Sequence, residues 1–100
     1  MITLCIRYTL DARKRSEFER YARSITKIIP RCGGALVGYW LPTKFAGPTN
    51  FGLALIDFPD LAAYEAYRDR LAADADFVTA AHRADECILV EDRAFMERAG

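Results

Sequence analysis

The stretch ALVGYWLPTKFAGPTNFGLALIDF, residues 35–58, decides the fold of this chain. It contains two segments rich in β-branched and aromatic residues, which suit the pleated surface of a sheet. We therefore predict strands over Ala35–Leu41 and Asn50–Phe58, joined as a hairpin by a loop over Thr43–Thr49 that contains Gly and Pro. The second of these strands is almost continuously apolar, which predicts that both of its faces are covered.

An amphipathic helix precedes this hairpin. Apolar residues recur at three- and four-residue steps with charged residues between them, which predicts a helix over Ala12–Ile29. Asp11 is the predicted N-cap, since its carboxylate can accept from the first free helix N–H groups. Pro30 is predicted to stop the helix, and Gly33 and Gly34 to supply a turn with positive φ.

More helical sequence follows the hairpin. Asp60 is the predicted N-cap of a second helix, because it precedes a run with helical periodicity. The predicted buried stripe of this helix consists of Leu61, Tyr64, Tyr67 and Leu71. After an interruption, a short third helix is predicted over Phe77–Arg83.

Two outer strands complete the pattern. Ile2–Leu10 alternates between an apolar face, which includes Tyr8, and a more polar face, as a strand does. Glu86–Glu91 begins the last strand, and the tail from Ala94 onward is polar and helix-prone. The order β-α-β-β-α-β predicts one α+β domain over residues 1–100. It is of the ferredoxin-like type, with an antiparallel sheet and helices on one face.

The apolar content exceeds what one helix-covered face of a sheet needs, at 52% of 100 residues. The face without helices is therefore predicted to pack against a second copy of the chain, because two-fold dimers are the commonest homo-oligomers. Two such sheets make a barrel-like body, and each subunit keeps a cleft between its sheet and its helices. The expected partner is the chain itself.

Charge and cysteine content exclude several function classes. Lys plus Arg and Asp plus Glu each total 14, so the basic excess of a typical nucleic-acid-binding domain is missing. The apolar runs are strand-sized, which predicts no membrane span, and no signal peptide is predicted. We expect a cytoplasmic location with three free thiols, of which Cys32, in a turn, is predicted to be the most exposed.

His82 is the only histidine and would be the default acid or base if it points into the cleft. The alternative is a surface histidine near the end of the third helix. Neither a second His nor a helix-spaced carboxylate pair lies near it in sequence, so we expect no metal. We expect no cofactor either.

Tyr39 and Trp40 are adjacent on a strand and therefore face opposite sides of the sheet. Each is a candidate either for packing in the core or the dimer interface, or for lining the cleft. Their order along the strand does not decide which side chain takes which role.

Asp57 and Arg7 lie on strands predicted to be neighbours, with Glu91 and Arg93 on the strand beyond. These four residues form either a polar cluster across one face or salt bridges near strand ends. In the cluster, an arginine would lower the pKa of a carboxyl group and create a charged anchor for a ligand.

Several short stretches resemble the NIPSNAP family of the dimeric α/β-barrel superfamily. They are Tyr8-Thr9-Leu10, Gly34–Trp40, Asn50, Phe58-Pro59-Asp60-Leu61 and Asp74-Ala75-Asp76-Phe77. The resemblance covers nearly the whole chain and implies a homodimer of ferredoxin-like subunits, each with a pocket. It implies no particular reaction, although related families include cofactor-independent monooxygenases and muconolactone isomerases.

The first strand departs from the family pattern. Family members often have E-L-R-x-Y, and the matching stretch Leu4–Tyr8 retains only Tyr8 in that register. The lost charges imply a more apolar pocket. The family register would point polar residues of this strand into the barrel, whereas its alternation places the apolar face under the helices, and the sequence leaves both open.

Three functions follow from these observations. The leading hypothesis is a homodimer that binds a small molecule in an apolar, aromatic-lined cleft. The candidate ligand-binding residues are Tyr8, Tyr39, Trp40, Asp57 and His82. The alternatives are a cofactor-independent monooxygenase or isomerase acting on a small aromatic or apolar substrate, and a structural protein that only associates. No residue can be assigned a catalytic role from sequence.

Overall fold

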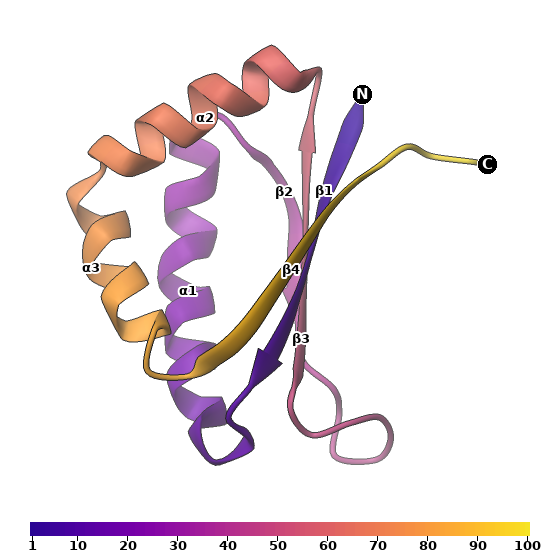
Figure 1. Cartoon of the computed structure of the whole chain (residues 1–100), viewed down its shortest axis with the longest axis vertical. Coiled ribbons are helices and arrows are strands. Elements are labelled where there is room, and N and C mark those ends of the chain that lie inside the picture. Colours follow the sequence, from indigo (N-terminus) through magenta and orange to yellow (C-terminus); the bar gives the residue numbers. More distant parts are fainter.

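The computed structural model describes all residues, from Met1 to Gly100. Four strands and three α-helices follow one another in the predicted order, so the α+β ferredoxin-like fold is confirmed (Figure 1). The elements are β1 (Ile2–Leu10), a 3-10 turn η1 (Ala12–Lys14), α1 (Arg15–Arg31), β2 (Ala35–Trp40), β3 (Phe51–Phe58), α2 (Leu61–Ala73), α3 (Ala75–Ala84) and β4 (Ile88–Met96).

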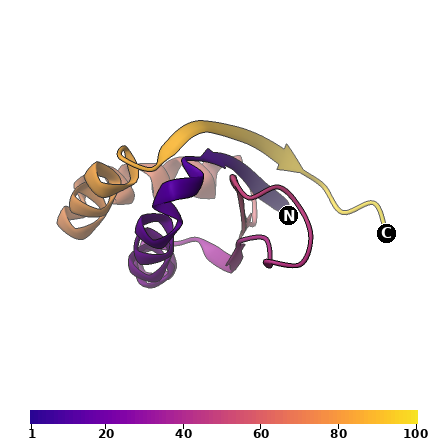
Figure 2. The ribbon, with the colours of Figure 1, turned by 90° about the horizontal axis from the view of Figure 1, so that it is seen from below.

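The strands form one antiparallel sheet in the order β2-β3-β1-β4. All three helices lie on the same side of this sheet, and the other side carries no element of the chain (Figures 1 and 2). None of the helices is both long and apolar enough to cross a membrane.

The helices cover the apolar face of β1, which settles the question that the sequence left open. Leu4, Ile6 and Tyr8 are buried under the helices, while Arg7 on the opposite face is exposed. Within the single chain, β3 is covered by helices on one face only. Every second residue of β3 is buried, and those between, such as Leu55, are half-buried on the helix-free face.

The helix α1 runs past the proline that was predicted to stop it. Pro30 lies inside the last turn, and the helix ends at Arg31. The backbone N–H of Cys32 donates to the carbonyl of Ile28 at 3.1 Å, which closes this last turn. Gly33 then takes a φ of +105°, a conformation that favours glycine, so the chain turns one residue after Cys32.

The second half of the chain differs from expectation in three places. Leu61 is 60% exposed and is not part of the buried stripe of α2. The third helix is longer than predicted, because Asp74 caps it by accepting from the N–H of Phe77 at 3.0 Å. The tail from Ala94 to Met96 is a strand rather than helix-prone coil, since it pairs with β1 as far as Thr3.

The cysteines are free, but their exposure differs from expectation. Cys32 is only 3% exposed, whereas Cys5 is half-buried on the helix-free face of the sheet. Cys87 is fully buried and directly precedes β4. It lies near the C-terminal end of β1, away from Cys5 in the middle of that strand. The contacts of Cys32 with Arg70 of α2 and with Asp74, which a turn position in the sequence does not reveal, explain the error.

Candidate functional site

Tyrosine side chains gather around a small cavity between the sheet and the helices, which we call the cleft. Tyr8 comes from the middle of the sheet, Tyr39 from its β2 edge, Tyr21 from α1 and Tyr67 from α2. The cavity among them has a volume of about 40 Å³. This is space for one water-sized group, since a water molecule takes about 30 Å³ of liquid. Most of the lining is apolar, and the polar atoms are phenol hydroxyls and three charged side chains.

The hydroxyls of Tyr8 and Tyr39 are joined by a 3.1 Å hydrogen bond. Their rings are stacked, with centroids 6.0 Å apart, and the ring of Phe18 packs edge-on against Tyr8 at 5.1 Å. Gly52, directly opposite Tyr8 on β3, leaves room for that ring, because a Cβ atom there would lie 3.1 Å from Phe18. The two phenol rings therefore pack against each other and against the ring of Phe18.

A β-bulge decides that Tyr39 rather than Trp40 lines the cleft. The register between β2 and β3 shifts between Leu36 and Gly38, so an extra residue is inserted in β2. Because side chains alternate along a strand, this one-residue shift turns Tyr39 toward the helices and Trp40 away from them. Tyr39 then lies opposite Ala54, whose small side chain is fully buried.

Burial keeps these phenols protonated. Desolvation raises the pKa of Tyr8 and of Tyr39 well above 10, and the pKa of Tyr21 to about 12. In the neutral form each hydroxyl can donate one hydrogen bond and accept others. Near neutral pH the tyrosines are thus hydrogen-bonding groups and not bases.

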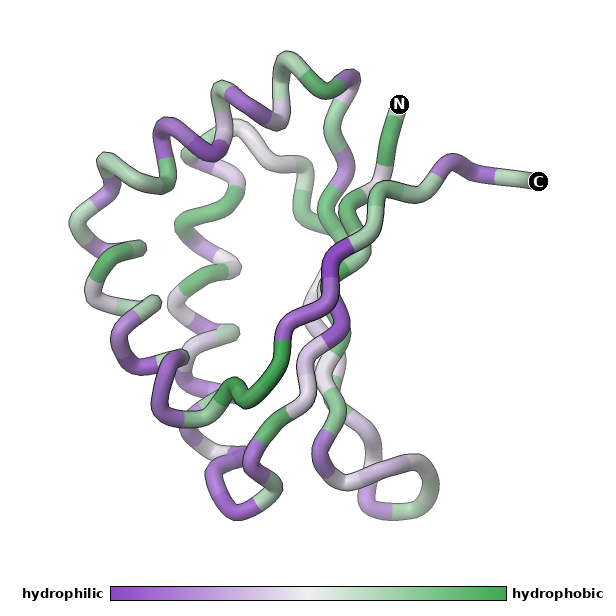
Figure 3. The backbone as a smooth tube through the Cα atoms, viewed as in Figure 1, coloured by the Kyte–Doolittle hydropathy of each residue, from purple (hydrophilic) through white to green (hydrophobic).

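Charged residues form the mouth of the cleft. Glu91 and Arg93 lie on the helix-facing side of β4, beside Tyr8 and Ile6 of β1, and are joined by an ion pair. They belong to the hydrophilic middle of β4 in Figure 3. Burial alone would lower the pKa of Arg93, but the Glu91 carboxylate raises it. Arg68 of α2 completes the charged part of the mouth.

The polar cluster expected from Arg7 and Asp57 does not form. Arg7 pairs with Leu53 and Asp57 with Thr3, so the two residues are four positions apart along the sheet. Both lie on the helix-free face, whereas Glu91 and Arg93 face the helices. The sequence could place these residues on neighbouring strands, but their register depends on the turns between strands.

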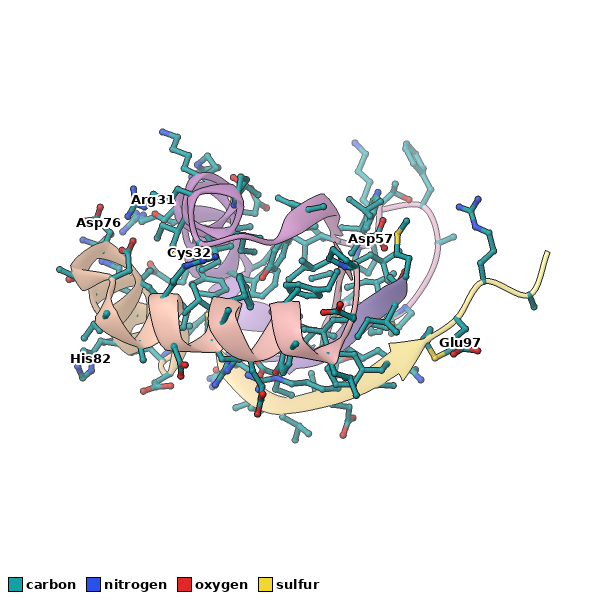
Figure 4. The ribbon with its side chains drawn as sticks, turned by 90° about the horizontal axis from the view of Figure 1, so that it is seen from above. Arg31, Cys32, Asp57, Asp76, His82 and Glu97 are labelled. Carbon is teal, nitrogen blue, oxygen red and sulfur yellow. The ribbon has the colours of Figure 1, made fainter.

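Only two of the five candidate residues come together in the cleft, namely Tyr8 and Tyr39. Trp40 is 45% exposed on the helix-free side of β2. Asp57 accepts a 2.5 Å hydrogen bond from the hydroxyl of Thr3 on that same face. His82 is exposed on the outer side of α3, away from the sheet (Figure 4).

Sequence reasoning missed other residues of the cleft. Tyr21 and Tyr67 belong to predicted apolar stripes, where they were indistinguishable from core residues. Neither Arg68 nor Phe77 was predicted to line the cleft, because their part in it depends on how α2 and α3 cross the sheet. No group of three or more His, Cys, Asp or Glu side chains is arranged to hold a metal ion.

The NIPSNAP family model matches residues 3–99. The chain belongs to the NIPSNAP family. The match extends over nearly the whole chain, in agreement with the resemblance of its short sequence stretches to this family. No curated protein matches this NIPSNAP chain.

Solved structures share the fold of this NIPSNAP chain. A NIPSNAP family protein of unknown function from Agrobacterium tumefaciens is 23% identical, with a TM-score of 0.87 over 99% of this chain and 88% of that one. A NIPSNAP domain protein from Burkholderia xenovorans is 23% identical, with a TM-score of 0.82 over 99% and 95%. A Nitrosomonas europaea protein named "Putative antibiotic biosynthesis monooxygenase" is 9% identical, with a TM-score of 0.76 over the full length of both chains.

Proposed function

We propose that the protein is a homodimer that binds a small molecule in the cleft between sheet and helices of each subunit. The ligand has an apolar or aromatic body and one oxygen that accepts or donates a hydrogen bond. The observation that carries this proposal is the Tyr8–Tyr39 hydroxyl pair, buried at the centre of an apolar wall. Two neutral phenols recognise an uncharged oxygen atom well, because each can donate as well as accept.

The size of the closed cleft limits how the ligand enters. A volume of about 40 Å³ admits the oxygen-bearing end of a molecule but not a whole ring. A dry cavity that binds benzene has a volume of about 150 Å³. A ring-sized ligand therefore requires Phe77 and Arg68, which line the cleft, to move outward. Both belong to the α2–α3 segment, which packs on the sheet less extensively than α1.

The second copy covers the helix-free face of the sheet. Trp40 and Met96 are about half exposed there, and Leu53, Leu55 and Cys5 lie between them, half-buried. Apolar side chains gathered from four strands favour an interface over a free surface. The three unpaired cysteines support a cytoplasmic location, where thiols stay reduced.

An enzyme is the second candidate. It is favoured by the fold shared with the Nitrosomonas protein and by the Glu91 carboxylate at the cleft mouth. A cofactor-independent monooxygenase or isomerase needs a group that removes a proton from its substrate. The raised pKa of the buried phenols keeps them protonated, so they cannot act as this base. Glu91 would take the role after release from its ion pair with Arg93.

A nuclear magnetic resonance screen of phenols, quinones and aromatic ketones against the labelled protein tests the proposal. We expect a bound compound to shift the backbone amides of Tyr8 and Tyr39 more than those of Trp40. Conversion of the compound, with or without oxygen uptake, would establish the enzyme. If no compound perturbs the cleft, the protein is a structural protein that only associates, which the small cavity volume would then explain.

A further inference from the structure

A basic groove lies between α1 and α3, away from the tyrosine cleft. Its volume is about 460 Å³, within the 300–1,000 Å³ range typical of ligand sites. Its floor is formed by Ile28 and Ala80, which are buried. Its walls carry the cations Arg20, Arg23, Lys27, Arg31 and Arg83 and one carboxylate, that of Asp76.

The charge of this groove is not a consequence of the overall composition. The chain has 14 basic and 14 acidic residues, so its formal net charge is zero. Five cations beside one carboxylate therefore leave the rest of the molecule with an acidic excess. A concave surface of one sign concentrates the electrostatic potential and attracts ions of the other sign.

The acidic residues near the groove leave three of its cations without a partner. Arg31 is bound by Asp74 at 2.7 Å and by Asp76 at 2.8 Å, and Figure 4 shows Arg31 and Asp76 beside each other. Arg20 lies 3.8 Å from Glu17. Arg23, Lys27 and Arg83 have no carboxylate oxygen within 4.0 Å.

Two of the unpaired cations repel each other on the helix that carries them. Arg23 and Lys27 are four residues apart on α1, where like charges destabilise a helix by about 0.2–0.5 kcal/mol per pair. Arg83 approaches from the last turn of α3 on the other wall. An anion seated between the two helices would relieve the repulsion and join both walls.

We propose that this groove binds a small anion that carries two or more negative charges, such as a phosphate compound or a polycarboxylate. The planar fork of Arg pairs in a bidentate manner with both kinds of oxyanion, and four of the five cations are Arg. The groove has no aromatic lining residue on which a base could stack, so it recognises the charged group. It lies on the helix side and stays open when a second copy covers the opposite face of the sheet.

Calorimetric titration of the full chain with sodium pyrophosphate and with citrate, at fixed ionic strength, tests this proposal. We expect the double variant Arg23→Ala/Lys27→Ala to bind the tighter anion about tenfold more weakly, since each exposed charge contact contributes modestly. The matched control Lys44→Ala/Arg98→Ala removes the same charge far from the groove and should bind like the wild type. Tighter binding of pyrophosphate assigns the groove to phosphate compounds, and tighter binding of citrate assigns it to polycarboxylates.

The proposal is wrong if neither anion binds at millimolar concentration, or if the control pair weakens binding as much as the groove pair does. The thermal unfolding midpoint checks that the variants fold. Without ligand, Arg23→Ala/Lys27→Ala should keep or raise the midpoint, because a repulsive pair is removed. Should the midpoint fall, Arg83→Ala on the opposite wall repeats the test. The outcome is independent of the tyrosine cleft, whose amides should not shift with either anion.

Discussion

The hydroxyl of Tyr8 lies 3.1 Å from that of Tyr39, although the two residues are 31 positions apart in the chain. This contact links the centre of the sheet to its β2 edge and places two polar atoms inside an apolar wall. Removal of either hydroxyl takes this hydrogen bond away from the other. The pair therefore adds two hydrogen-bonding groups to the apolar wall and couples them to the stability of the fold.

The hydrogen bond predicts a non-additive mutational response. Tyr8→Phe should lower the free energy of unfolding by about 1–3 kcal/mol, since the Tyr39 hydroxyl is then buried without a partner. Tyr8→Phe/Tyr39→Phe should cost less than the sum of the two single variants, because no orphan hydroxyl remains. Urea denaturation of the four proteins measures this coupling. Strictly additive losses would show that the hydroxyls do not depend on each other.

The tyrosines predict a loss of stability in alkali. Burial raises the pKa of Tyr21 from 10.0 to about 12, and those of Tyr8 and Tyr39 are raised as well. A raised pKa means that the folded state holds its protons more tightly, so this stabilisation is complete below pH 10 and is lost as pH rises toward 12. Denaturant midpoints between pH 9 and 12 should fall for the wild type. They should fall less steeply for Tyr21→Phe.

Asp74, the N-cap of α3, should contribute stability that is lost in acid rather than in alkali. The Arg31 guanidinium and the N–H of Phe77 lower the pKa of Asp74 from 3.8 to about 2. A lowered pKa gives stability that is present above pH 3.8 and is lost as pH falls toward 2. Asp74→Asn retains a capping oxygen but cannot titrate, so its unfolding midpoint should vary less between pH 4 and 2 than that of the wild type. Equal slopes would show that Asp74 does not contribute to acid unfolding.

The helix-free face predicts a variant that dissociates. Leu55→Arg places a charge at the centre of this face, where a second copy would have to bury it. We expect sedimentation at micromolar concentration to give twice the chain mass for the wild type and the chain mass for the variant. The fluorescence of Trp40, the only tryptophan, should shift toward that of a solvated indole on dissociation. A wild-type monomer would contradict the interface.

Features of the fold and of the cleft could be predicted from sequence where they depend on neighbouring residues of one strand. They could not be predicted where they depend on pairing between strands. The alternation within Ile2–Leu10 distinguished an apolar from a polar face of β1 but did not decide which of them the helices cover. The opposite orientation of Tyr39 and Trp40 follows from strand geometry alone. The choice between the two depends on the bulge after Leu36, which arises from pairing with β3. The end of β4 at Met96 likewise depends on a partner strand, and weak local propensity hid it.

The ring resonances of Tyr8 and Tyr39 test the proposed function most directly. They can be followed in protein labelled with ¹³C-tyrosine and titrated with the phenols, quinones and aromatic ketones of the screen. The proposal predicts that at least one compound shifts both rings, and that Tyr8→Phe/Tyr39→Phe binds it about tenfold or more weakly, whereas Trp40→Phe binds it normally. Unchanged Tyr8 and Tyr39 resonances at millimolar concentrations of every compound would contradict a ligand site at this hydroxyl pair.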